Sequence, residues 1–216
     1  MVENGIILID KPANMSSFGV VARVRRQLTQ HFGRKKMKVG HTGTLDPFAT
    51  GLMILVVGKE CKNADKYSKL DKTYEATIVL GKTSTTGDPE GDITQVSDKK
   101  VAQAEIEKAI EQFRGAIMQT PPAFSAIKIN GQRAYKLARA GKTVDIPERQ
   151  VTIHSLEIIN YEYPYLQIKT HVSSGTYIRT LAQDIGNKLG VGAYCSELRR
   201  TVIGEHVIEN AKSLTD

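Results

Sequence analysis

One isolated carboxylate is the group of this chain best placed by sequence to do chemistry. Asp46 is the single acidic residue between Lys11 and Lys59, an interval with nine lysines and arginines. Neighbouring positive charge keeps a carboxyl group ionised, and an ionised carboxylate can act as a nucleophile or stabilise positive charge. Because Pro47 biases the preceding residue towards extended geometry, Asp46 is expected on a loop. The alternative is that Asp-Pro only begins a turn.

The elements around this loop are predicted from their apolar patterns. Residues 52–57 form an unbroken apolar run between Gly51 and Gly58, typical of a buried strand that would anchor the loop. Residues 5–10 predict another strand. Ser16 or Ser17 can cap a helix that ends at Gly33. The apolar stripe of this helix consists of Val21, Val24, Leu28 and Phe32.

The second half of the chain supplies a tyrosine and an arginine. Residues 73–80 alternate as a strand with Tyr74 on its apolar face. Residues 151–161 and 165–172 predict two more strands. Ser174–Thr176 should cap a helix whose first turn contains Arg179. Since the helix dipole disfavours a cation there, an anion should compensate Arg179, and Asp46 is the candidate. The alternative is an exposed arginine that reaches a surface acid.

Charge and cysteine content limit the class of protein. The 216 residues hold 30 lysines and arginines against 23 acids, a net charge of +7, which favours polyanionic partners, with nucleic acid before a membrane surface. Residues 34–38 are basic, and residues 114–149 predict a basic lobe inserted between core elements. Cys61 and Cys195 form no disulfide framework, which indicates a reducing cytoplasm. No membrane span or signal peptide is predicted, so a soluble cytoplasmic protein is expected.

Several kinds of site are disfavoured. The five histidines show no metal-ligand spacing, so no metal site is expected. The stretch from Gly51 to Lys59 fails the phosphate-loop spacing, and no nucleophilic serine motif occurs. Asp46 has no acidic neighbour with which to form a glycosidase pair. With nucleic acid as the substrate, a single carboxylate indicates chemistry at a base or its glycosidic bond, on a base flipped out of its stack.

Several motifs of the chain match one family. The most specific is residues 40–47, GHTGTLDP, followed by residues 49–51, ATG. The supporting matches are Asp10-Lys11-Pro12, Lys72-Thr73-Tyr74, Pro121-Pro122 with Ser125-Ala126-Ile127-Lys128, Gly175 to Thr180, and Leu198-Arg199-Arg200. On these residues the chain resembles the TruB family of tRNA pseudouridine synthases over nearly its whole length.

The resemblance implies an α+β pseudouridine synthase fold, with a mixed, largely antiparallel sheet flanked by helices. It implies isomerisation of uridine 55 in the tRNA T-loop without a cofactor, by a protein expected to act as a monomer. Asp46 would be the nucleophile, attacking either the ribose C1′ or the pyrimidine C6. Tyr74 would stack on the base and Arg179 would pair with Asp46.

Other roles follow from the same resemblance. His41, Tyr177 and Leu198 would shape the substrate pocket, and Lys11 and Pro12 would support the catalytic loop. The basic thumb at about 114–149 would bind RNA. Its cations include Lys128, Arg133, Lys136 and Arg139. Residues 1–216 are expected to form one catalytic domain without the C-terminal PUA-type domain of bacterial relatives. Two alternatives remain open: the same chemistry on another RNA or through a guide RNA and protein partners, or a non-catalytic RNA-binding or RNA-folding module.

Overall fold

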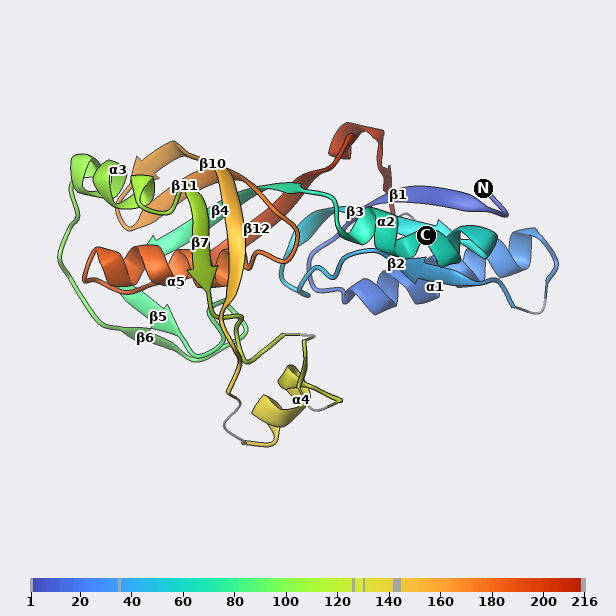
Figure 1. Cartoon of the computed structure of the whole chain (residues 1–216), viewed down its shortest axis with the longest axis horizontal. Coiled ribbons are helices and arrows are strands. Elements are labelled where there is room, and N and C mark those ends of the chain that lie inside the picture. The colour runs from blue at the N-terminus through green and yellow to red at the C-terminus, as the bar shows by residue number, and fades with distance from the viewer. Residues whose placement is uncertain (1, 35, 126, 130, 142–144, 215–216) are drawn as a thin grey trace. The chain divides into compact units, whose positions relative to one another are not determined.

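The computed structural model describes residues 2–34, 36–125, 127–129, 131–141 and 145–214 (Figure 1). Its contacts divide the chain into two compact units. The first consists of residues 1–74 and 199–216, and the second of residues 75–198. Two strands, β4 (Lys72–Leu80) and β12 (Ala193–Ile203), contribute residues to both units.

A mixed sheet forms the first unit. Strand β3 pairs antiparallel with β1 along its full length, and on its other side it pairs antiparallel with β2 and parallel with β12. Strand β14 pairs parallel with β1, and β13 pairs with β12. The elements of this unit, besides parts of β4 and β12, are β1 (Gly5–Lys11), α1 (Ser17–His31), β2 (Val39–His41), β3 (Thr50–Val57), η1 (Gly58–Asn63), α2 (Ala64–Ser68), β13 (His206–Val207), η2 (Ile208–Asn210) and β14 (Lys212–Ser213).

The predicted elements of this unit are found. The apolar run of β3 is buried from Gly51 to Val57, as expected of a central strand. Ser16 caps α1 by accepting a hydrogen bond from the Gly19 amide, which leaves Ser17 free to turn inwards. Val20, Val21, Val24 and Leu28 form the buried stripe of α1. Near the end of the chain the short 3₁₀ turn η2 precedes strand β14.

The second unit contains a sheet with the strand order β12–β4–β11–β10–β7. Strand β10 pairs antiparallel with both β11 and β7. The elements of this unit are β5 (Lys82–Ser84), β6 (Ile93–Gln95), α3 (Gln103–Glu111), β7 (Gly115–Gln119), β8 (Lys128–Ile129), β9 (Gln132–Arg133), α4 (Ala134–Arg139), β10 (Arg149–Glu162), β11 (Tyr165–Val172) and α5 (Ile178–Lys188).

The predicted basic lobe at 114–149 begins with a core strand. Residues 115–119 form β7 and pair with residues 149–153 of β10, so the excursion from the sheet comprises residues 120–148. Figure 1 shows this excursion, with α4 at its far end, leaving the sheet below β7 and β10. It contains the expected β8–β9 hairpin. The side chain of Lys128 and residues 142–144 lie outside the described part of the chain.

Helix α3 stops at Glu111, and Gly115 begins β7 with a positive φ of 88°. One local prediction in the second unit is wrong. The hydroxyl groups of Ser174–Thr176 do not cap α5, whose N-cap residue is Tyr177 and has no capping side chain. The expected placement of Arg179 in the first turn of α5 is correct.

The fold class is α+β, with a mixed sheet flanked by helices, as predicted. Within the ranges that the structure describes, no helix combines the length and the apolar character needed to cross a membrane.

Candidate active site

The loop that carries Asp46 is held by its backbone. The Ser17 hydroxyl donates to the Leu45 carbonyl at 2.9 Å and accepts from the Leu45 amide at 2.8 Å. Ser17 is buried at the start of α1. The Asp46 carbonyl accepts from the Ala49 amide at 3.2 Å, which closes a turn over Pro47. The first helix therefore fixes the residue directly before Asp46 by two hydrogen bonds.

Lys11 holds the loop on the other side of Asp46. Its ammonium group donates to the carbonyl oxygens of Pro12, Met15 and Pro47, at 2.8, 2.7 and 3.2 Å. The side chain is fully buried at the end of β1. Lys11 thus joins β1, the start of α1 and the Asp46 loop, which is the arrangement that a loop-supporting lysine requires. Pro12 is exposed beside it.

Arg200 fixes the earlier part of the loop. Its Nε donates to the Leu52 carbonyl at 2.8 Å and its Nη2 to the Gly43 carbonyl at 3.1 Å. Strand β12 lies against β3 here, and a Cβ on Gly51 would lie 2.3 Å from the Arg200 carbonyl oxygen. Only glycine fits this approach, and Gly51 also has a φ of +108°. The close packing of β12 on β3 therefore requires the glycine of the ATG sequence that follows Asp46.

Lys72 is a second buried cation of this unit. Its ammonium group donates to the carbonyls of Ser68 and Leu70. Burial, with a smaller contribution from the nearby Arg200 cation, lowers the pKa of Lys72 from 10.5 to about 8. A Cβ on Gly43 would lie 3.9 Å from the Lys72 Cε. Lys72 thus lies beside the loop. Its pKa of about 8 means that it loses its proton at mildly alkaline pH.

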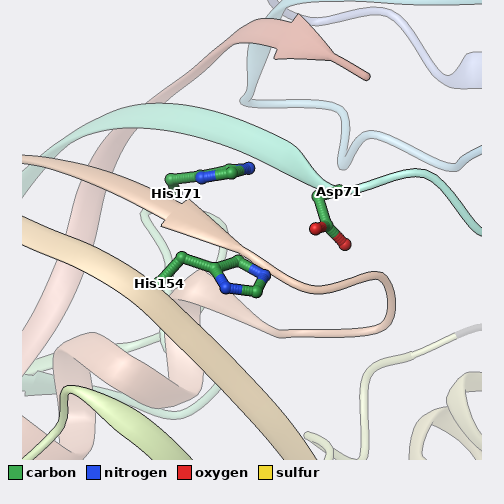
Figure 2. A group of neighbouring side chains, drawn as sticks. All are labelled: Asp71, His154 and His171. Atoms are coloured by element: carbon green, nitrogen blue, oxygen red, sulfur yellow. The ribbon is translucent and has the colours of Figure 1, made fainter.

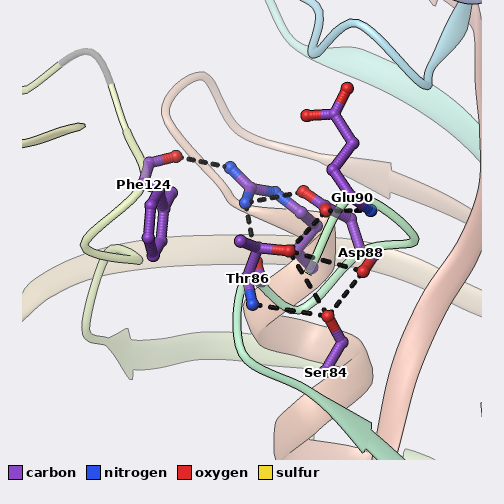
Figure 3. Close-up of polar contacts among 6 residues, drawn as sticks. Ser84, Thr86, Asp88, Glu90 and Phe124 are labelled. Carbon is purple, nitrogen blue, oxygen red and sulfur yellow. Dashed lines mark hydrogen bonds and ion pairs between the residues drawn. The ribbon is translucent and has the colours of Figure 1, made fainter. Parts of the chain in front are cut away.

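Arg179 of the second unit forms a buried ion pair with Asp88 (Figure 3). Its Nη1 donates to the Asp88 Oδ2 at 3.0 Å and to the Thr86 carbonyl at 2.8 Å, and its Nη2 donates to the Phe124 carbonyl at 2.8 Å. Arg179 is 2% exposed, so the alternative of a surface arginine is wrong.

Asp88 is itself held by several donors. Its Oδ1 accepts from the Thr86 hydroxyl at 2.5 Å and from the Glu90 amide at 3.0 Å, and the Ser84 hydroxyl donates to its carbonyl at 2.5 Å. Asp88 is 3% exposed, although it begins an acidic stretch of the sequence. An anion compensates the cation in the first turn of α5, as the dipole argument requires.

The residues predicted to form pocket walls are also fixed. The Gln119 side-chain amide accepts from the Tyr177 amide at 2.8 Å and donates to the Tyr177 carbonyl at 3.0 Å. The guanidinium carbon of Arg149 lies 5.0 Å from the centre of the Tyr177 ring, a cation–π geometry. Leu198 is buried in β12.

The predicted site residues are distributed over both units. Asp46, His41, Tyr74, Lys11 and Pro12 belong to the first unit. Those of the second unit are Arg179, Tyr177, Leu198 and the thumb cations. His41 ends β2, and Tyr74 lies near the start of β4. The pairing of Asp46 with Arg179 stays a prediction.

Of the thumb residues, Arg133 ends β9, and Lys136 and Arg139 lie on α4 with exposed side chains. The guanidinium carbon of Arg139 lies 5.8 Å from the centre of the Tyr135 ring.

Two histidines that are distant in sequence are neighbours on the paired strands β10 and β11. His154 on β10 and His171 on β11 have ring centroids 4.8 Å apart (Figure 2). The register of the two strands shifts at His154, where a bulge turns its side chain towards His171. Spacing along the chain did not anticipate this pair.

Comparison with known proteins decides the family. The family model described as "TruB family pseudouridylate synthase (N terminal domain)" matches residues 27–178 of the chain. The chain belongs to the TruB family. A second family model, described as "tRNA pseudouridylate synthase B C-terminal domain", matches residues 179–216 of this TruB-family chain.

Similar proteins agree with this result. The chain is 44% identical over 213 residues to tRNA pseudouridine synthase B of Pseudomonas fluorescens, covering 99% of the chain and 68% of that protein. It is 41% identical over 215 residues to the protein of the same name from Aquifex aeolicus, covering 99% of the chain and 73% of that protein.

Solved structures are also similar to this TruB-family chain. A chain of a Cbf5-Nop10-Gar1 complex has a TM-score of 0.72 and 28% identity, and a chain of an H/ACA RNP bound to a substrate RNA containing 2′-deoxyuridine has a TM-score of 0.69 and 25% identity. The two matches cover 98% and 99% of the present chain. They cover only about half of those two chains, 53% and 52%.

Four structural residues of the site were missed or only quoted as part of a motif. Ser17, Asp88, Gln119 and Arg200 make their contacts across sequence separations of 28, 91, 58 and 148 residues. The only available signal was the motif membership of Arg200. Local patterns report helix caps and apolar faces, and they do not report which distant carbonyl a buried polar group will reach.

Proposed function

We propose that this TruB-family chain isomerises uridine 55 in the T-loop of tRNA to pseudouridine. The bond between uracil N1 and ribose C1′ breaks, the uracil rotates, and a bond from C5 to C1′ forms while C5 loses a proton and N1 gains one. Nothing is consumed overall. The names of the relatives, tRNA pseudouridine synthase B, support tRNA as the substrate.

In this proposal Asp46 is the nucleophile, and its first attack is at C1′ or at C6. The observation that carries the assignment is the bracing of its loop, since Ser17 binds the residue before Asp46 and Lys11 binds the residue after it. A nucleophile benefits from such bracing because its attack depends on near-contact geometry.

The roles of the other residues come from the family resemblance. Tyr74 is assigned to stacking on the flipped base and Arg179 to electrostatic support of the carboxylate. The interactions of Arg179 with Asp88, Thr86 and Phe124 are consistent with this role, because they hold a guanidinium in a fixed orientation. His41, Tyr177 and Leu198 are assigned to the pocket walls, and the thumb to RNA contact.

The test is release of tritium from C5-labelled uridine in an unmodified tRNA transcript, with no guide RNA or protein partner added. The wild-type chain should release tritium, and Asp46→Asn should release none, because an amide is a far poorer nucleophile than a carboxylate. Thermal unfolding of Asp46→Asn should match the wild type, since the side chain adds little core packing. Wild-type inactivity on bare tRNA would favour the alternatives of another RNA or a non-catalytic RNA-binding module. Substantial turnover by Asp46→Asn would refute the assigned nucleophile.

A further inference from the structure

A second feature of the first unit lies away from the Asp46 loop. A groove of about 680 Å³ is bounded by the residues before β1, by the segment between α1 and β2, and by the turn from β3 into η1. The groove is built around Gly58, whose φ is +63° and whose amide donates to the Lys38 carbonyl at 2.9 Å. A Cβ on Gly58 would lie 2.3 Å from the Asn4 side-chain oxygen, so three chain segments meet closely here.

Five cations line this groove, and they are its main chemical feature. They are Arg34, Lys36, Lys38, Lys59 and Lys62. Local geometry directs them outwards: Lys36 and Lys38 are exposed on either side of the buried Met37. Lys59 and Lys62 are three residues apart in the 3₁₀ helix η1, where side chains at i and i+3 eclipse. The exposed lysines therefore form two pairs, each presented on one side of its own segment.

Nearby carboxylates do not neutralise this charge. Glu3, the one acid of the lining, forms an ion pair with Arg34. Glu60 accepts hydrogen bonds from the Tyr67 hydroxyl and the Asn63 amide. Among the residues that the structure describes, the four lysines of the groove have no carboxylate within ion-pair distance. Four positive charges held together without counterions are expected to attract a polyanion.

We infer that this groove binds backbone phosphates of the RNA substrate, at a distance from the modified base. The inference rests on the proposed function, because it takes tRNA as the polyanion. Lysine ammonium groups recognise phosphate as point charges and carry no sequence information, so the groove would add affinity and orientation and leave base selection unchanged.

Strand β3 gives the distance between this groove and the Asp46 loop. Thr50 and Gly58 lie at opposite ends of the strand, and eight residues at about 3.3 Å each span roughly 26 Å. This distance, counted from the end of β3 next to the Asp46 loop, exceeds the length of about 17 Å that five base pairs span even at the 3.4 Å per step of B-DNA. The groove therefore reaches RNA beyond a short stem-loop and distinguishes a full tRNA from a minimal T-arm fragment.

The experiment measures binding and turnover separately. Lys59→Ala/Lys62→Ala is compared with Lys66→Ala/Lys69→Ala, a control pair in the same unit with the same spacing, exposure and charge change. Equilibrium binding of unmodified tRNA transcript is followed from 0.1 to 1 M salt, and tritium release is measured on the tRNA and on a T-arm stem-loop of about five base pairs.

The groove variant should lower the slope of log affinity against log salt by about 1.5, since each lost phosphate contact removes about 0.7 to 0.9. If affinities converge at 1 M salt, this slope change corresponds to about 30-fold weaker binding at 0.1 M. The control and the stem-loop turnover should stay near wild type. Equal slopes for the groove variant and the control, or an equal loss on the stem-loop, would overturn the inference while the proposed function stands. A wild-type chain that binds tRNA without releasing tritium would instead overturn the proposed function.

Discussion

The Arg179 Nη1 and the Asp88 Oδ2 lie 3.0 Å apart, with side chains that are 3% and 4% exposed. The two residues are 91 positions apart, on α5 and on the turn between β5 and β6. Arg179 also donates to the carbonyl of Phe124, near the start of the thumb excursion. One guanidinium therefore connects a helix terminus, a loop and the thumb within the second unit.

Breaking this pair from the acidic side should destabilise the protein strongly. Asp88→Ala is expected to lower the free energy of unfolding by about 3 to 5 kcal/mol, the usual cost of removing one member of a buried ion pair. Urea unfolding measures this change. Asp92→Ala removes an exposed carboxylate from the same loop and should change stability by less than about 0.5 kcal/mol. Similar small effects for both variants would show that Asp88 does not hold Arg179.

Ser17 should affect turnover through the position of Asp46. Ser17→Ala removes both hydrogen bonds to Leu45 and should lower kcat by on the order of 100-fold, the effect of misplacing a reacting group by about 1 Å. KM for tRNA should change little, because Ser17 is buried and its hydroxyl is bonded to Leu45.

The adjacent serine provides the control. Ser16→Ala removes the cap of α1 and should cost about 1 kcal/mol of stability, with kcat close to the wild type. If both variants lose stability and kcat in parallel, Ser17 has only a structural role. A rise in KM alone would also contradict a positioning role.

Lys72 should make stability depend on alkaline pH. Its pKa is about 8 in the folded protein and 10.5 when unperturbed, so between these values the unfolded state binds more protons than the folded state. The free energy of unfolding should therefore rise with pH in this window, by up to about 3 kcal/mol for this group.

The measurement is urea unfolding at pH 7.5, 9 and 10 for the wild type and Lys72→Met. Other groups titrate in both proteins, so the informative quantity is the difference between the two. The free energy of unfolding of Lys72→Met minus that of the wild type should be largest at pH 7.5 and should fall as the pH rises. Parallel curves for the two proteins would show that Lys72 keeps its ordinary pKa.

The thumb should bind RNA close to the modified loop. Arg133→Ala/Lys136→Ala should lower the salt slope by about 1.5 and raise KM for both tRNA and the T-arm stem-loop. This pattern differs from that expected of the Lys59/Lys62 groove, which should affect tRNA alone. Unchanged binding and salt slope in the thumb variant would show that other cations make the main contact.

The sequence by itself determined most of the elements, and it indicated the loop that is proposed to carry the nucleophile. The apolar run of β3, the capped helix α1 and the alternation of β4 follow from local periodicity, which depends only on residues a few positions apart. The position of Asp46 as a lone acid in a basic interval was also visible, as were the family motifs around it. The basic excursion was visible in outline, although its first residues turned out to form β7.

Only the tertiary structure decided how the loop is held and what surrounds Arg179. Ser17 was predicted as one of two equivalent caps, yet Ser16 caps the helix and Ser17 binds Leu45. Asp88 begins an acidic stretch of the sequence, yet it is buried against Arg179. These outcomes depend on which polar groups become buried together after the chain has folded. A buried donor or acceptor must find a partner, and sheet order brings that partner from 28 to 148 residues away.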